Sequence, residues 1–214
     1  MADEPATTEL LHARAAAGDE AAWGMLLSAH QERLARTVSF RIDPRLRRRI
    51  DAVDVVQDAF VEASAHREAY FRAPTVPLFL WLRGVVSNKL RELHRRHLGT
   101  QMRDANRELP IEARRPCDDT SAALCAHLTG GLTRPSVAAV RDEVKARLAE
   151  ALDEMDALDR EVLALRHFEQ LTNAEAAQVL GIQERAAGKR YLRALERLKK
   201  ILSEMPGGLT EVRI

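Results

Sequence analysis

Apolar residues recur every three or four positions along most of this chain, the spacing of helices that bury one face. Three such stripes occupy the first hundred residues: Trp23, Leu26, Leu27, His30 and Leu34; then Val53, Val56, Phe60 and Ala63; then Leu78, Leu82, Val85, Val86, Leu90 and Leu93. Asp51 or a neighbour is placed to cap the second helix. Two prolines interrupt the pattern over 70–77, which predicts a loop. The alternating pattern of strands is missing, so the sequence predicts an all-α fold.

The helical periodicity fades between residues 99 and 135, where prolines and glycines are frequent, and returns after residue 136. We therefore expect two small helical domains over 1–98 and 136–205, joined by a flexible linker over 99–135. The linker is expected to hold a short helix around 121–128, and residues 206–214 form a tail.

The segment 171–182 carries the most informative local pattern. Thr172 or Asn173 can cap a short helix, and Gly181 can end it with a positive φ. A basic helix follows two residues later, and two short helices joined by a Gly-containing turn predict a helix-turn-helix. The apolar face of the second helix comprises Ala187, Tyr191, Ala194, Leu195, Leu198, Ile201 and Leu202. Gly188 costs that helix about 1 kcal/mol, and we hypothesise that it permits close approach to a sugar-phosphate chain.

Charge changes this picture because the net charge of +1 conceals strong segregation. Residues 184–200 carry seven bases against two acids, whereas residues 51–62 carry four acids and no base. A basic helix after a tight turn suits the DNA major groove. Its candidates for base contact are Gln183, Glu184, Arg185, Ala186 and Lys189, and its candidates for backbone contact are Arg190, Arg193 and Arg197.

The acidic helix presents an exposed face whose members follow an i, i+3, i+4, i+7 spacing: Asp54, Gln57, Asp58 and Val61. This face suits a basic protein surface and would be repelled by DNA. From spacing alone, a purely solubilising face is the simpler interpretation.

Several classes of protein are excluded. No window holds the roughly 18 to 20 apolar residues of a membrane span, and the polar N-terminus lacks the basic region of a secretory signal. Two cysteines in an unpatterned segment, Cys117 and Cys125, fit a reducing cytoplasm; with His127 they lack a fourth metal ligand. His167 and Glu169 form no metalloprotease motif and no glycine-rich phosphate loop is present, so we expect no enzyme, no metal and no cofactor.

Taken in order, the motifs resemble a known family. DAVDVVQDAFVEA (51–63) followed by FLWLRGVVSNKLRELHRR (79–96) resembles region 2 of bacterial RNA polymerase sigma factors. LDREVLALRHFEQLTNAEAAQVLGIQERAAGKRYLRALERLKKIL (158–202) resembles their region 4. The small size and the lack of a region 3 resemble the extracytoplasmic-function group of the sigma-70 family.

The resemblance implies a transcription initiation factor of the cytoplasm, acting as a monomer within the polymerase holoenzyme. Its partners would be core RNA polymerase, through the clamp of the largest subunit and the flap, and promoter DNA. Asp54, Gln57, Asp58 and Val61 would then contact the clamp. The linker would thread the RNA exit path. Relatives are commonly held by an anti-sigma protein, although no residue here identifies one.

The resemblance also implies two DNA sites. Region 2 would capture a flipped base of the promoter −10 element and hold the melted strand, through Tyr70, Phe71, Trp81, Asn88, Arg91, Arg95 and Arg96. Region 4 would read the −35 element through Gln183, Glu184, Arg185, Lys189, Arg190, Arg193 and Arg197.

Some positions depart from the family pattern. Ser87 replaces a common basic residue and Gln183 a common Ser or Thr cap, while Ala187 and Gly188 replace larger residues. These departures affect the promoter preference rather than the docking mode. The Arg-rich segment 41–51 is longer than in many relatives, and it either touches upstream DNA or is a surface turn.

Two other functions remain open at this point. A stand-alone helix-turn-helix regulator would bind duplex DNA tightly without polymerase. A non-DNA-binding adaptor would dock its partner without salt-dependent DNA affinity.

Overall fold

The computed structural model describes residues 4–43, 45–102, 117–130 and 138–204, and within these residues it contains helices and no strand. The predicted all-α fold is confirmed. The chain divides into two compact units, Met1–Ser39 with Arg45–Gln101 and Phe40–Pro44 with Met102–Ile214. The expected tail and about half of the expected linker lie outside the described residues. No helix in the described part is both long and apolar enough to cross a bilayer.

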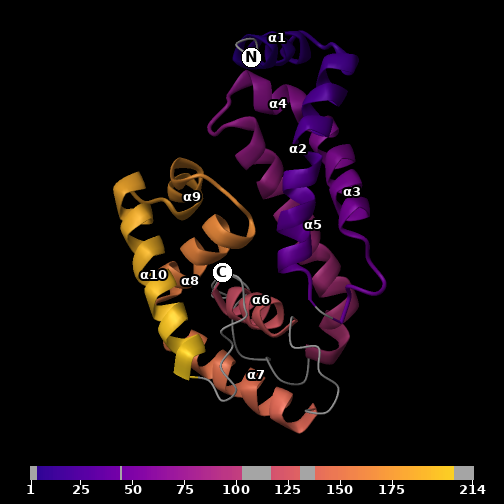
Figure 1. The fold of residues 1–214 in the computed structure, drawn as a ribbon. Coiled ribbons are helices and arrows are strands. Elements are labelled where there is room, and N and C mark those ends of the chain that lie inside the picture. Colours follow the sequence, from indigo (N-terminus) through magenta and orange to yellow (C-terminus); the bar gives the residue numbers. More distant parts are fainter. Residues whose placement is uncertain (1–3, 44, 103–116, 131–137, 205–214) are drawn as a thin grey trace. The chain divides into compact units, whose positions relative to one another are not determined.

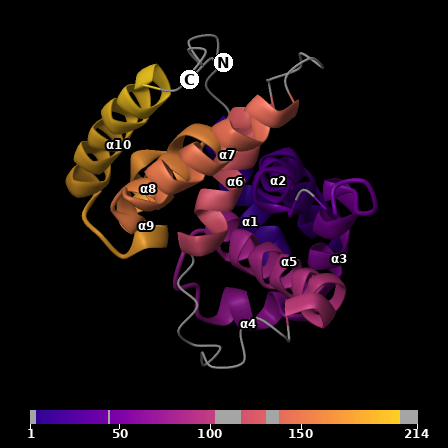
Figure 2. The ribbon, with the colours of Figure 1, turned by 90° about the horizontal axis from the view of Figure 1, so that it is seen from below.

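The first unit contains α1 (Glu4–Ala16), α2 (Glu20–Arg41, whose last two residues are grouped with the second unit), α3 (Ala52–Ala65), α4 (Arg67–Arg72) and α5 (Leu78–Met102). Helices α2, α3 and α5 lie side by side in two views (Figures 1 and 2). Their apolar stripes meet in a core that includes Leu34, Val56 and Leu82. One stripe member is wrong: Val53 is 41% exposed and Val55 is buried instead. The helix turns by about 100° per residue, which groups Val55 with Val56 on the inner face.

The predicted loop over 70–77 is shorter in the structure. Helix α4 extends to Arg72, so Tyr70 and Phe71 are helical and only residues 73–77 join α4 to α5. The prolines that predicted the loop, Pro74 and Pro77, constrain only their own positions and the residues before them. Because the constraint of Pro74 begins at residue 73, α4 can continue to Arg72.

The second unit contains α6 (Cys117–Gly130), α7 (Ala138–Asp153), α8 (Ala157–Leu163), the π-helix η3 (Ala164–Phe168), α9 (Asn173–Leu180) and α10 (Glu184–Glu204). Leu148, Leu163 and Leu198 are fully buried in one cluster. The short helix expected within the linker is confirmed as α6, and it is longer than expected. Leu124 and Leu128 of α6 are buried in the same cluster, so this part of the expected linker packs into the second unit.

The helix-turn-helix has the predicted caps. Thr172 is the N-cap of α9: its Oγ1 accepts the Glu175 N–H at 3.1 Å, and its own N–H donates to Glu175 Oε2 at 2.8 Å. This reciprocal pair is a capping box. Gly181 ends α9 with φ +64°, a conformation that glycine adopts without steric cost. The turn into α10 is therefore specified by local sequence.

Two arginines with largely buried side chains stabilise the second unit. Arg160 Nη1 donates to the carbonyl oxygens of Leu152 (2.7 Å), Asp153 (2.9 Å) and Met155 (2.8 Å), which satisfies the last turn of α7. Arg41 lies 2.5 Å from Glu161 and 2.6 Å from Glu169. Burial alone would lower the pKa of Arg41, but the two carboxylates outweigh it and raise that pKa, so the guanidinium stays charged.

Candidate nucleic-acid and protein interfaces

The predicted acidic face lies on the exposed side of α3. Asp51 starts this helix, because its Oδ1 accepts the Val53 N–H at 2.7 Å. Asp54, Gln57, Asp58 and Val61 are all exposed, as predicted, and Val61 is 74% exposed. Lys89 Nζ approaches Asp58 Oδ2 at 3.7 Å, a loose pair in solvent. An exposed valine among carboxylates is compatible with a surface that docks a basic protein partner.

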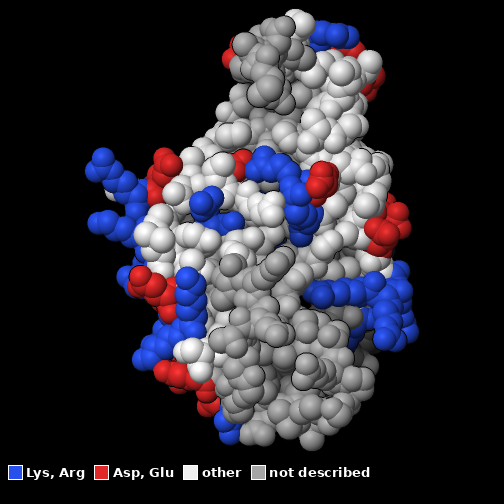
Figure 3. Space-filling view, viewed as in Figure 1, with Lys and Arg blue, Asp and Glu red and all other residues white. Residues whose placement is uncertain are grey.

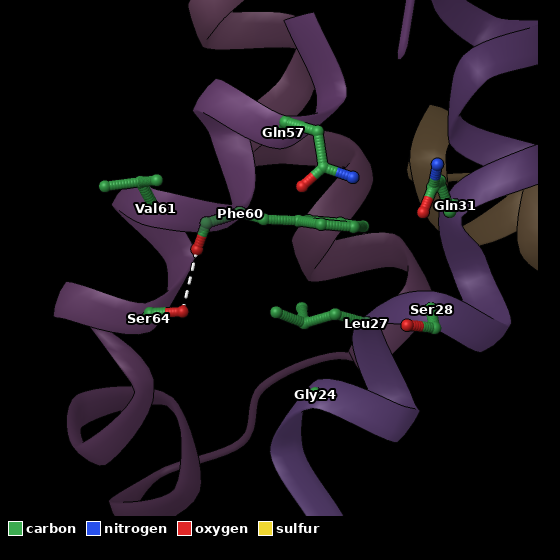
Figure 4. Close-up of a pocket in the computed structure, with 8 residues that line it drawn as sticks. All are labelled: Gly24, Leu27, Ser28, Gln31, Gln57, Phe60, Val61 and Ser64. Atoms are coloured by element: carbon green, nitrogen blue, oxygen red, sulfur yellow. Dashed lines mark hydrogen bonds between the residues drawn. The ribbon is translucent and has the colours of Figure 1, made fainter. Parts of the chain in front are cut away.

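A groove of about 420 Å³ adjoins this face, between α2 and α3 (Figure 4). Phe60 reaches from α3 toward α2 above Leu27, and Gln57 and Gln31 lie on opposite sides of the opening (Figure 4). A Cβ placed on Gly24, at one edge, would meet no atom within 4 Å. The full lining is Gly24, Leu27, Ser28, Gln31, Gln57, Phe60, Val61 and Ser64. Because Gln57 and Val61 belong to both features, the acidic face and the groove form one continuous surface.

The aromatic residues predicted for the −10 site form a cluster that supports the loop 73–77. The Tyr70 ring lies 4.7 Å from Trp81 and 5.2 Å from Phe71, between ring centroids. Its hydroxyl donates to the Val76 carbonyl at 3.1 Å. Trp81 therefore packs on the residue whose hydroxyl holds this loop. Tyr70 is only 9% exposed, whereas Phe71 and Trp81 are half-buried and keep part of each ring accessible.

The polar −10 candidates lie further along α5. Asn88, Arg91, Arg95 and Arg96 are exposed. Arg91 Nη2 donates to Asn88 Oδ1, and Arg96 Nη2 lies 2.6 Å from Glu92 Oε1. Positions 88, 91 and 95 follow the i, i+3, i+7 spacing of one helix face. Helix α5 thus carries aromatic residues in its first turn and cations on a surface stripe further along.

The basic residues of α10 divide into two groups. Gln183, just before the helix, and Glu184, Arg185 and Lys189 are exposed at its N-terminal end. Within the described residues, neither Arg185 nor Lys189 forms an ion pair. Lys and Arg side chains project from this helix at the left of Figure 3. Arg185 and Lys189, four residues apart, therefore offer two unneutralised cations on one face.

The other arginines of α10 are paired with acids of α8 and of the turn between α7 and α8. Asp159 is 8% exposed and receives Arg190 Nη1 at 2.6 Å and Arg193 Nε at 2.8 Å. Asp156 Oδ1 lies 3.1 Å from Arg190, and Glu154 lies 3.5 Å from Arg197. These three acids were not predicted, since they precede their partners by more than 30 positions and only the fold brings them together.

Asp159→Asn should destabilise the second unit by about 2 kcal/mol, since it removes the buried carboxylate that Arg190 and Arg193 share and leaves Arg190 only its pair with Asp156. Burial favours the neutral form of Asp159, but hydrogen bonds from Arg193 and Arg190 outweigh it and lower its pKa below the usual value. The contribution of a carboxylate with a lowered pKa is present at neutral pH and is lost as the pH falls through the folded-state pKa.

Thermal unfolding followed by circular dichroism tests this prediction. The melting temperatures of wild type and variant should differ by a constant amount from about pH 5 to pH 8 and converge below about pH 4. Equal melting temperatures at pH 7 would mean that the Asp159 pairs contribute nothing to stability.

Gly188→Ala should stabilise the second unit by up to about 1 kcal/mol, raising its melting temperature by about 4 °C. An added Cβ would lie 3.5 Å from Asn173 Nδ2 on α9, an ordinary contact. A side chain at position 188 would therefore project toward α9. This argues against the hypothesis that Gly188 makes room for DNA. Unchanged DNA affinity with a higher melting temperature is the expected result, and a large loss of affinity would restore that hypothesis.

The chain is similar to a known protein family over most of its length. A family model described as "Sigma-70, region 4" matches residues 145–198, which include α8, α9 and most of α10. RNA polymerase sigma factor NccH of Alcaligenes xylosoxydans xylosoxydans is 28% identical over 210 residues, 93% of this chain and 96% of its own length. RNA polymerase sigma factor CnrH of Cupriavidus metallidurans is 31% identical over 200 residues, 90% of this chain and 93% of its own length.

A solved structure of CnrH, in complex with the cytosolic domain of CnrY, is also similar to this chain. The identity is 30%, the TM-score is 0.50, and the match covers 91% of this chain and 96% of that one. The similarity to these relatives thus extends well beyond the helix-turn-helix. The chain belongs to the RNA polymerase sigma factors, in the extracytoplasmic-function group of the sigma-70 family.

Proposed function

We propose that this sigma factor binds core RNA polymerase and directs it to promoters by contacting their −10 and −35 elements, with DNA melting at the −10 element. The observation that carries the proposal is the division of charge on α10. Among the residues that the structure describes, Arg185 and Lys189 form no ion pair, and they lie at the start of a helix that follows a capped turn, where a groove-reading helix contacts base edges. Arg190, Arg193 and Arg197 would contact the sugar-phosphate backbone of the DNA, where each would exchange its acidic partner for a phosphate or share it.

The first unit supplies the polymerase contact in this proposal. Helix α3 offers Asp54 and Asp58 beside an open groove lined by Phe60 and Leu27. A basic protein helix with one apolar side chain fits both features, because the carboxylates attract it and the groove accepts the side chain. Duplex DNA would be repelled by the same carboxylates.

The −10 contacts in this proposal come from α4 and α5. Phe71 and Trp81 expose part of their rings beside the loop 73–77, which suits stacking of an unpaired base. Arg91 and Arg95 lie along the exposed face of α5, where they would neutralise phosphates of a melted strand. Extruding a base costs a few kcal/mol, and these contacts offset it.

The proposal extends to location and to a protein regulator. A sigma factor works where core polymerase is, so we expect this chain to act in the cytoplasm. CnrH was solved with the cytosolic domain of CnrY bound, which supports an anti-sigma protein as a further partner of this chain.

Run-off transcription with purified core polymerase, with and without this chain, on a library of promoter fragments tests the proposal. Transcripts from a subset of templates that appear only when the chain is added are the expected result. Tight binding of the chain alone to duplex DNA, with no added transcripts, would indicate a stand-alone regulator. Co-elution with core enzyme without any transcript or DNA affinity would indicate an adaptor.

A further inference from the structure

We propose that the turn between α2 and α3 binds the phosphate backbone of the duplex that flanks the −10 element, through Arg47, Arg48 and Arg49. This inference rests on the proposed function and assigns it an additional DNA-binding surface. The sequence left two roles open for the Arg-rich segment, and the structure gives its arginines different environments.

The first arginine of the segment is structural. Arg41 is buried against Glu161 and Glu169, so it is unavailable to a ligand. Arg45 has an interaction partner within the protein. The three arginines that follow Leu46 are exposed.

The turn that carries these three arginines is fixed at both ends. Leu46 is buried, and its carbonyl oxygen accepts the N–H groups of Arg49 at 2.8 Å and Ile50 at 3.0 Å. Asp51 then caps α3 immediately afterwards. The backbone of the turn is thus held by a buried anchor and a helix cap, which lowers the entropy lost on binding.

Within the described part of the chain, no carboxylate forms an ion pair with Arg47, Arg48 or Arg49. Three adjacent guanidinium groups repel one another unless a partner supplies closely spaced negative charge. Duplex DNA carries one charge per about 1.7 Å of its axis, and guanidinium binds phosphate with two parallel hydrogen bonds. A phosphate backbone therefore matches this surface in charge and in hydrogen-bonding chemistry.

The turn lies at the end of the first unit that also carries the last cations of α5. Helices α3 and α5 run in opposite directions (Figure 1), and the approach of Lys89 to Asp58 shows which positions of the two helices are level with each other. Asp51 is seven residues before Asp58, and Arg96 is seven residues after Lys89. Because the helices are antiparallel and rise 1.5 Å per residue, Asp51 and Arg96 both lie about 10 Å from the Lys89–Asp58 level, toward the same end of the unit. Figure 3 shows Lys and Arg side chains gathered in this part of the first unit.

The juxtaposition extends the proposed −10 surface. A DNA strand bound along the Arg91 and Arg95 face of α5 would continue to the end of the first unit that holds the turn. There its phosphates, and those of the adjoining duplex, would meet Arg47, Arg48 and Arg49. The contact would not read sequence, because phosphates are the same at every base pair. It would add affinity and salt dependence.

Holoenzyme assembled from core polymerase and this chain allows a direct test by fluorescence anisotropy at several salt concentrations. One promoter fragment carries duplex flanks around a single-stranded −10 element, and a second carries the single-stranded element alone. The triple variant Arg47→Ala, Arg48→Ala, Arg49→Ala is compared with the triple Lys variant at the same positions, which keeps the charges and leaves the Leu46 anchor intact.

The Ala variant should reduce the salt slope on the flanked fragment by about 2 to 3, because each lost phosphate contact removes about 0.9. The Lys variant should stay close to wild type, and neither variant should change binding to the fragment without flanks. An unchanged slope for the Ala variant on the flanked fragment would overturn the inference alone. So would loss of co-elution with core polymerase, which would assign the turn to a protein surface. Failure of wild-type holoenzyme to bind either fragment would instead overturn the proposed function itself.

Discussion

Asp54→Arg should abolish binding to core RNA polymerase, with at least a 100-fold loss of affinity and no promoter-dependent transcription. Asp54 is exposed on α3, on the same face as Asp58. This face adjoins the groove between α2 and α3 that Val61 helps to line. If that face docks a basic surface, the new arginine puts like charges together, which costs several kcal/mol at an interface. Asp58→Arg should have the same effect, because its loose pair with Lys89 contributes little to folding.

The control for this prediction is Glu9→Arg, an identical change of charge at an exposed position of α1. Size-exclusion chromatography with core polymerase should show co-elution of wild type and the Glu9 variant, and separate elution of the α3 variants. Far-ultraviolet circular dichroism should give the same helical content for all of them. Co-elution of both α3 variants at wild-type affinity would remove the docking function from this face.

The sequence was sufficient to predict the helices that carry these surfaces. Short-range signals define them: Asp51 before α3, Thr172 with Glu175 at the start of α9, and Gly181 at its end. Each acts within four residues, so it can be recognised without the fold. The exposed position of the α3 carboxylates followed from helical periodicity in the same way.

Contacts between distant residues could not be predicted. Asp159 and Arg193 are 34 positions apart, and Arg41 and Glu169 are 128 apart. Nothing in the local pattern distinguishes Arg193, which has a buried carboxylate partner, from Arg185, which has none in the described part of the chain. The sequence therefore predicted which part of α10 would contact bases and which the DNA backbone, but not that Arg190, Arg193 and Arg197 have acidic partners within the protein.

Arg185→Ala combined with Lys189→Ala tests what that division means for function. Both residues are exposed and lack an ion pair within the described residues, so their loss should leave the fold unchanged. A base-edge contact contributes about 1–3 kcal/mol of discrimination, so the double variant should lose about 30-fold or more in preference for its promoter over unrelated DNA. Core-polymerase binding should persist, because α3 is untouched.

The matched control is Lys199→Ala with Lys200→Ala, which removes the same charge from the distal part of the same helix. If α10 reads bases only near its N-terminus, this control should weaken DNA binding equally on all templates and keep the preference. Run-off transcription on promoter and scrambled templates separates the two effects, since loss of a base contact changes the ratio between templates and loss of a phosphate contact does not. A double variant at Arg185 and Lys189 that lowers transcription by the same factor on every template would show that these cations only neutralise phosphates, and base reading would then have to come from Gln183 or Glu184.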